Sequence, residues 1–131
     1  MSARLVITKD GRTVVSVPLL QPGVEENSDL ETAGPLLGEL VEIFSIASNE
    51  RRLRLMIQLM KSPETRFTEL LQVGVNPKLV QDCVAPMVRS GLLVHEGKGA
   101  AYRPSAKGAL VITMVTRVLA ETLAAAESGK I

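Results

Sequence analysis

Residues 76–108, which read NPKLVQDCVAPMVRSGLLVHEGKGAAYRPSAKG, decide the fold that the sequence predicts. Asn76-Pro77 is a strong helix start, because an asparagine cap and a proline in the first turn both suit backbone groups that lack helical partners. Ser90-Gly91 ends this helix, and the apolar run 92–94 begins a strand. The tip Gly97-Lys98-Gly99 turns the chain into a returning strand, and another helix follows.

Apolar residues at helical spacing predict two longer helices upstream. The first covers 36–47 and is expected to bury Leu37, Leu40, Val41 and Phe44. The second opens at Ser48 or Asn49 and is expected to bury Leu53, Met56, Ile57 and Met60. Residues 66–68 suggest a short strand, and a brief helix then ends at Gly74. Pro86 lies inside the helix that starts at Asn76-Pro77 and is expected to kink or shorten it.

The first 35 residues have a different character. β-branched residues in 5–8 and 13–17 flank Asp10-Gly11, a pair that suits a tight turn, so residues 1–17 are predicted to form a β-hairpin. Proline, glycine and acidic residues without a sustained period make 18–34 a linker. The remaining residues, 35–131, form the main domain, and the predicted class is mainly α with small β (α+β).

Composition allows one compact core. The chain has 131 residues, of which 46% are hydrophobic, and 15 basic side chains against 14 acidic ones give a net charge of +1. A general attraction to nucleic acid is therefore not indicated by the whole molecule. Within 76–107, however, five basic side chains stand against two acidic ones. This local excess favours phosphate contact by the helix and hairpin of that segment.

The last helix, expected from about Ser105 to Glu127, is apolar over most of its circumference. One small core needs only part of that surface, so the rest is expected to pack against a second copy of the chain. The predicted homodimer interface consists of Leu110, Val111, Met114, Val115, Val118, Leu119 and Leu123.

Several classes of function lack the residues that they need. Cys83 is the single cysteine and His95 the single histidine, so no metal site or other cofactor is expected, and no catalytic group of nucleophile, base and acid can be assembled. Cys83 is expected to be a small buried hydrophobe, with a redox switch as the alternative. The single cysteine and a start without an apolar stretch of secretory length favour a cytoplasmic protein. The run 109–115 is too short to span a bilayer, so no membrane segment is expected.

The order of helix, turn, helix and hairpin is typical of winged-helix DNA-binding domains. Four pieces strengthen this interpretation: the run 47–55, Phe67-Thr68-Glu69-Leu70-Leu71, the run 88–93, and Gly97-Lys98-Gly99 with the run 102–105. From about residue 44 to 127 the chain resembles the ArsR-type winged-helix transcriptional regulators. The resemblance implies a dimer that inserts the helix after Asn76 in the major groove of double-stranded DNA.

The resemblance also implies which residues contact DNA. On the inserted helix they are Asn76, Lys78, Leu79, Gln81 and Asp82, and on or beside the hairpin they are Lys98, Arg103 and Lys107. Lysine and arginine would neutralise phosphates, whereas Gln81 and Lys78 would donate to base edges.

The sequence thus predicts a dimeric winged-helix DNA-binding protein, a transcriptional regulator without metal sensing. Two alternatives stay open. Asp82 and an outward-facing Leu79 favour a winged-helix module that binds another protein, with the amino-terminal hairpin offering an edge strand. An architectural protein that binds DNA without sequence preference is the other alternative.

Overall fold

The computed structural model describes residues 4–19, 31, 33–74 and 76–130. It divides into two compact units, Met1–Gly38 and Glu39–Ile131. Helices dominate the described residues, and each of the two antiparallel sheets has two strands. The predicted α+β class is confirmed at this level.

The first unit contains the hairpin of β1 (Arg4–Lys9) and β2 (Arg12–Pro18). Asp10 and Gly11 both have positive φ, at 52° and 76°, as expected for a tight Asp-Gly turn. The pairs Leu5↔Val17 and Ile7↔Val15 put apolar side chains on one face. A short 3-10 helix, η1 (Gly34–Leu36), follows, but most of the predicted linker 18–34 lies outside the described residues.

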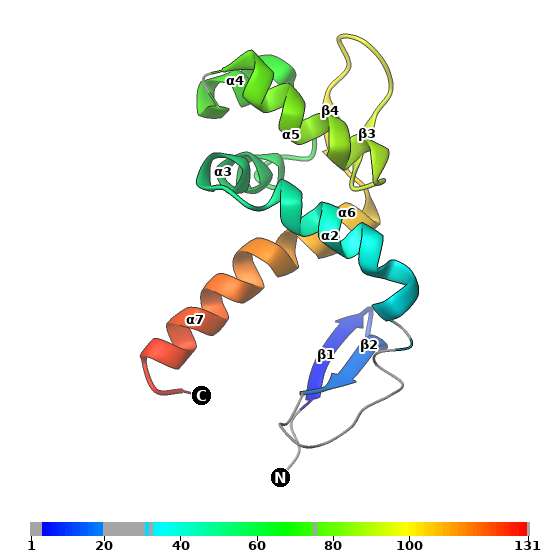
Figure 1. Cartoon of the computed structure of the whole chain (residues 1–131), viewed down its shortest axis with the longest axis vertical. Helices are drawn as coiled ribbons and strands as arrows, with labels where there is room; N and C mark the ends of the chain where they lie inside the picture. Colours follow the sequence, from blue (N-terminus) through cyan, green and yellow to red (C-terminus); the bar gives the residue numbers. More distant parts are fainter. Residues whose placement is uncertain (1–3, 20–30, 32, 75, 131) are drawn as a thin grey trace. The chain divides into compact units, whose positions relative to one another are not determined.

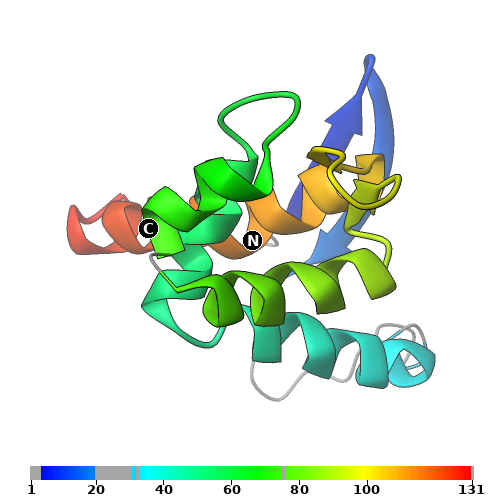
Figure 2. The same cartoon turned by 90° about the horizontal axis from the view of Figure 1, so that it is seen from above.

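The second unit is built from helices with one hairpin between them (Figures 1 and 2). The chain leaves the first unit through α2 (Leu37–Ile46) and continues through α3 (Glu50–Leu59), α4 (Phe67–Gly74), α5 (Pro77–Arg89), β3 (Leu93–His95), β4 (Tyr102–Pro104), α6 (Ala106–Thr113), the π-helical turn η2 (Met114–Val118) and α7 (Leu119–Glu127). Helices α3, α4 and α5 pack on one another, and α3 also contacts β4 and η2.

The core lies where these helices meet the hairpin. Its buried side chains come from α2 to α6, and they are Ile43, Ile46, Leu55, Met56, Leu59, Leu70, Val80, Cys83, Val84, Met87, Leu92, Leu93, Tyr102 and Ile112. Burial of each larger aliphatic side chain contributes about 1.5–3 kcal/mol to the hydrophobic term. The core therefore fixes the rotation of each helix about its own axis.

The predicted stripe of α2 was wrong at three of its four residues, and the fourth, Leu40, is half-buried. Ile43 and Ile46 are buried, whereas Val41 is 66% exposed and Phe44 61% exposed, and Leu37 is exposed as well. This helix is apolar on more than one side, so helical spacing alone could not select the buried face. The start of α3 was right, because the Asn49 side chain accepts a hydrogen bond from the Arg52 backbone N–H at 2.9 Å.

Two of the four residues expected in the core from α3 lie elsewhere. Met56 is buried and Leu53 packs against the core, but Ile57 and Met60 are exposed. Leu55 and Leu59 occupy the core instead. Helix α3 and its end therefore carry apolar side chains that the rest of the described chain does not bury.

The predicted strand over 66–68 was displaced. Thr65 makes an isolated bridge to Tyr102, with N–H to carbonyl distances of 2.8 Å in both directions, and α4 begins at Phe67. The Glu69 side chain accepts a hydrogen bond from the Arg66 backbone N–H and so caps α4. This capping contact favours a helix that begins at Phe67, where a short strand was predicted.

Pro86 does not shorten α5. The helix continues to Arg89, and the Ser90 N–H donates to the Pro86 carbonyl at 3.0 Å. Only the hydrogen bond that the missing N–H of Pro86 would make is lost. The predicted start of α5 is confirmed, with Asn76 as its cap and Pro77 in its first turn.

The chain from Ala106 to Glu127 forms one continuous helix that passes through Thr113, Thr116 and Arg117. This helix is long and apolar enough to cross a membrane, and only 6% of its most apolar 18-residue stretch is buried. The sequence argument against a membrane segment rested on the short apolar run 109–115, whereas the apolar stretch of the helix extends well beyond this run. A single helix of this kind is weak evidence for a membrane protein, because core helices of soluble proteins have similar composition.

Gly108 joins the last helix to the hairpin. A Cβ atom at this position would lie 1.8 Å from the Leu92 carbonyl oxygen. Around it, the Ser105 hydroxyl donates to the Gly91 carbonyl and accepts from the Gly108 N–H, and the Ser105 N–H donates to the Leu92 carbonyl. Any larger residue than glycine would push α6 away from the strand β3.

We therefore expect Gly108→Ala to lower the free energy of unfolding by about 1–3 kcal/mol, because backbone atoms must move to admit the methyl group. Urea unfolding at one fixed protein concentration measures this change. Gly38→Ala is the matched control, since nothing lies within 4 Å of a Cβ there. Equal midpoints for Gly108→Ala and the unmodified chain would contradict the packing described.

Candidate nucleic-acid interface

Helix α5 presents one polar side to solvent. Its apolar stripe, Val80, Cys83, Val84 and Met87, is buried in the core. The polar side chains that this leaves exposed are Lys78, Gln81, Asp82 and Arg89, and Pro77 in the first turn is exposed as well. These positions recur at helical spacing, so they form a continuous face along the helix.

Asn76 has a structural task at the start of this face. Its side-chain oxygen accepts hydrogen bonds from the backbone N–H groups of Lys78, at 2.8 Å, and Leu79, at 3.4 Å. The cap uses the amide oxygen, so the side-chain NH₂ is the group that remains to donate outward. Asn76 therefore fixes where α5 begins.

Leu79 was expected to face outward, and this was wrong. Its side chain is half-buried and packs against the core. Leu79 follows the cap by three residues and precedes buried Val80, so the start of α5 sits close to the core on two sides. An exposed leucine for binding a protein partner is not available at this position.

The β3–β4 hairpin stands beside α5. Leu93, Val94 and His95 pair with Pro104, Arg103 and Tyr102, respectively. The His95 and Tyr102 rings stack with centroids 4.1 Å apart and planes 12° apart. Tyr102 is only 6% exposed, and burial raises the pKa of its hydroxyl. The bridge from Thr65 ties Tyr102 to the segment before α4, so β4 is contacted both by β3 and by this segment.

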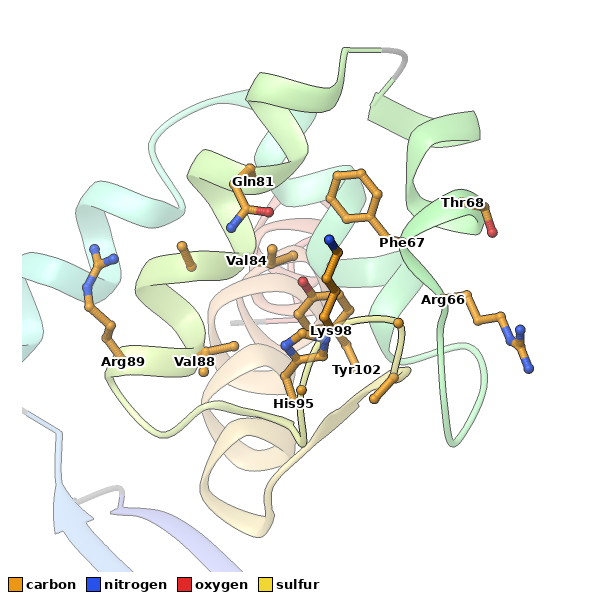
Figure 3. Close-up of a pocket in the computed structure, with 14 residues that line it drawn as sticks. Arg66, Phe67, Thr68, Gln81, Val84, Val88, Arg89, His95, Lys98 and Tyr102 are labelled. Carbon is orange, nitrogen blue, oxygen red and sulfur yellow. The ribbon is translucent and has the colours of Figure 1, made fainter.

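A groove of about 810 Å³ separates α5 from the hairpin (Figure 3). Its described lining residues are Arg66, Phe67, Thr68, Gln81, Val84, Ala85, Val88, Arg89, His95, Gly97, Lys98, Gly99, Ala100 and Tyr102. Figure 3 shows Gln81, Val84 and Val88 on α5 and His95, Lys98 and Tyr102 on the hairpin, with Arg66 and Arg89 toward the two ends. Three cations line the groove, and none of these lining residues is acidic.

The three cations predicted for the hairpin region differ in what they contact. Lys98 is exposed at the tip and has no ion pair among the described residues. Arg103 pairs with Glu96 at 3.2 Å, but both groups are exposed, so the pair is weak. Lys107 pairs with Glu39 of α2 and donates to the Ser90 carbonyl at 3.0 Å. The Lys107 ammonium therefore joins α2, the end of α5 and α6.

The structure brings Gln81 and Lys98 into one groove, and it places Lys78 and Asp82 on the exposed face of the same helix. Sequence reasoning missed Arg66 and Arg89 as members of this surface. Arg89 carried a usable signal, because it belongs to the same helical face as Gln81 and Asp82. Arg66 carried none, since its position depends on the long-range bridge from Thr65 to Tyr102.

The seven residues predicted for the dimer interface fall into two groups. Leu110, Met114, Val118, Leu119 and Leu123 are exposed. Val111 and Val115 are half-buried and pack against the chain's own core. The apolar surface left without a partner within the described chain is therefore narrower along α6 and η2 than the sequence suggested, whereas both predicted residues of α7 are exposed.

Cys83 is fully buried, and desolvation raises the pKa of its thiol to about 11. Its ordinary role is that of a small hydrophobe in the stripe of α5. The described part of the chain contains no group of three or more His, Cys, Asp or Glu side chains arranged to hold a metal ion.

Sequence comparison adds no assignment: no protein-family model matches the chain, and no curated protein is significantly similar to it. The features of the molecule that bear on function are the groove, the exposed face of α5 and the charges around them. These features are local and independent of how the two units are arranged.

We expect Cys83 to resist thiol reagents in the folded protein. With a pKa of about 11, roughly one thiol in a thousand is ionised at pH 8, and the sulfur is also shielded from solvent. Absorbance during treatment with a disulfide reagent should show no labelling until denaturant is added. Rapid stoichiometric labelling of the folded protein would contradict the buried position and reopen the redox alternative.

Proposed function

We propose that this protein is a dimeric winged-helix DNA-binding protein that regulates transcription. The observation that carries the proposal is the groove between α5 and the β3–β4 hairpin, with Arg66, Arg89 and Lys98 among its lining residues and no carboxylate among those described. A surface of this kind suits the phosphate backbone of nucleic acid. The order of α4, α5 and hairpin supports the winged-helix assignment, in which α5 is the reading helix and the hairpin is the wing.

The exposed face of α5 supplies the reading groups. The major groove of B-form DNA is about 12 Å wide and admits one α-helix. Gln81 is central on this face, and a glutamine amide can bond the N6 and N7 positions of adenine in a bidentate manner. Lys78 lies one turn nearer the helix start and suits either a guanine edge or a phosphate. In this proposal, Gln81 specifies sequence and the surrounding cations position the helix.

Phosphate contacts are assigned to Lys98 at the wing tip and to Arg66 and Arg89 at the ends of the groove. Arg103 contributes once DNA competes with its weak, exposed pair to Glu96. Lys107 is left out of the contact set, because its ammonium is engaged by Glu39 and the Ser90 carbonyl. Asp82 is the acidic residue on the reading face and opposes phosphate nearby.

The alternative of a protein-binding module loses one of the two residues that favoured it, since Leu79 packs against the core, while Asp82 is exposed on α5. Dimerisation through the carboxyl-terminal helix remains part of the proposal. It is supported by the five exposed apolar residues of the predicted interface. Two copies would present two reading helices, and their separation would set the spacing of the DNA half-sites.

The proposal is tested by titrating fluorescent duplex DNA with the protein and measuring anisotropy at several salt concentrations. Binding should weaken as salt rises, with a slope set by about 0.9 for each neutralised phosphate. Competition with random duplex then separates a regulator, which prefers its own sites, from an architectural protein, which does not. Absence of binding at low ionic strength would reject the proposed function.

Lys98→Ala should weaken DNA binding for all sequences and reduce the magnitude of the salt slope by about 1, because one phosphate contact is lost. Lys130→Ala removes the same charge from the far carboxyl-terminal end and is the matched control. Anisotropy titrations of both variants make the comparison. Equal losses for the two variants would show that only net charge matters and that the wing does not contact DNA.

Asp82→Asn should strengthen binding about 1.4- to fivefold at low salt, because it removes repulsion of about 0.2–1 kcal/mol between an exposed carboxylate and phosphate. The gain should shrink at high salt, where such repulsion is screened. The same titration measures both effects. An unchanged affinity would indicate that this face of α5 does not approach the DNA backbone.

A further inference from the structure

Helix α7 has almost no contact with the rest of the described chain. From Arg117 to Lys130 every residue except Ala125 is exposed, and Figures 1 and 2 show the helix projecting from the second unit. Leu119 is 52% exposed and Leu123 is 65% exposed. A projecting segment of this length is marginally stable in water without tertiary packing. Contact with a partner surface would therefore stabilise this helix.

A second groove, of about 550 Å³, lies between α3 and the carboxyl-terminal helix. Ile57, Met60 and Lys61 line it on one side, and Thr113, Thr116, Arg117 and Ala120 line it on the other. Its apolar members include exposed Ile57 and Met60, which were expected in the core and are not used there. Its charged members are both basic.

We propose that this groove, here called the α3 groove, binds α7 of a second copy of the chain. Leu119 and Leu123 of the incoming helix would cover Ile57 and Met60. The inference rests on the proposed dimer and specifies how its two copies meet.

Charge favours this occupant. The α3 groove carries Lys61 and Arg117, whereas α7 carries the acidic residues Glu121 and Glu127. Arg117 and Glu121 face each other within one chain at 3.5 Å, but both are largely exposed, so this pair is weak and can be exchanged for one between copies. An acidic, leucine-bearing helix thus meets a basic, apolar groove.

The proposed contact also forms a closed dimer with no further copies required. Each copy offers one α7 and one α3 groove, so a two-fold axis satisfies both at once and leaves no unpaired end. Because Ala120 lines the groove and Ala124 lies one turn further along α7, small side chains would let the two helices approach closely. Direct pairing of α7 with α7 would instead bring the acidic residues Glu121 and Glu127 of one copy near those of the other. It would also leave Ile57 and Met60 exposed.

Disulfide trapping tests this geometry with two full-length variants, Met60→Cys and Leu123→Cys, mixed and gently oxidised. Native Cys83 is buried and does not interfere. The expected result is a disulfide-linked pair that joins one Met60→Cys chain to one Leu123→Cys chain, identified by mass spectrometry. Leu123→Cys alone should give at least tenfold less linked dimer. Linking of Leu123→Cys chains to each other in preference, or no linked dimer in the mixture, would overturn the inference.

A charge exchange provides a second readout on side chains at the surface. Lys61→Glu should raise the dimer dissociation constant measured by sedimentation, and adding Glu121→Lys with Glu127→Lys to the same chain should restore much of the loss. Lys130→Glu is the control and should have little effect. Failure of both the trapping and the charge rescue in a protein that dimerises and binds DNA would remove this inference alone. Successful trapping without DNA binding would remove the proposed function alone.

Discussion

Burial of one side of α5 is the constraint on which the rest of the structure depends. Val80, Cys83, Val84 and Met87 enter the core together, and this fixes the rotation of the helix about its axis. Gln81, Asp82 and Arg89 must then face solvent, because they occupy the opposite positions of the same turns. The proposed reading face is thus a direct consequence of core packing.

The hairpin is held beside that face by contacts between residues that are distant in sequence. Thr65 pairs with Tyr102, and Gly108 packs directly on the backbone of Leu92. The second contact fixes the base of the hairpin and the first fixes the strand pair nearest its tip, while Lys98 stays exposed at the tip. A surface assembled from a rigid helix and an anchored hairpin suits a rigid duplex, because little conformational entropy remains to be lost on binding.

Local signals were sufficient for much of this fold. The cap at Asn76, the Asp10-Gly11 turn and the order of helices and hairpin follow from chemistry within a few residues. The buried sides of α2 and α3 did not follow, because both helices are apolar on more than one face and only their neighbours select one. The same reason hid Arg66, whose place in the groove depends on pairing between Thr65 and Tyr102. Gln81 and Lys98 were predicted from the helix and the hairpin tip on which they lie. The ion pairs of Arg103 and Lys107 were not predicted, because the Arg103 pair depends on how the two strands of the hairpin align and the Lys107 pair on Glu39, which is 68 residues away.

The most direct test of the account is a map of backbone amide chemical shifts while duplex DNA is added to the isotopically labelled protein. If α5 reads DNA and the hairpin follows its backbone, the largest changes will fall in residues 76–82 and 96–101. The α7 segment, which is assigned to contact between copies, will change little. Large shifts confined to 106–127, with residues 76–82 and 96–101 unaffected, would contradict the central claim that the groove beside α5 is the nucleic-acid interface.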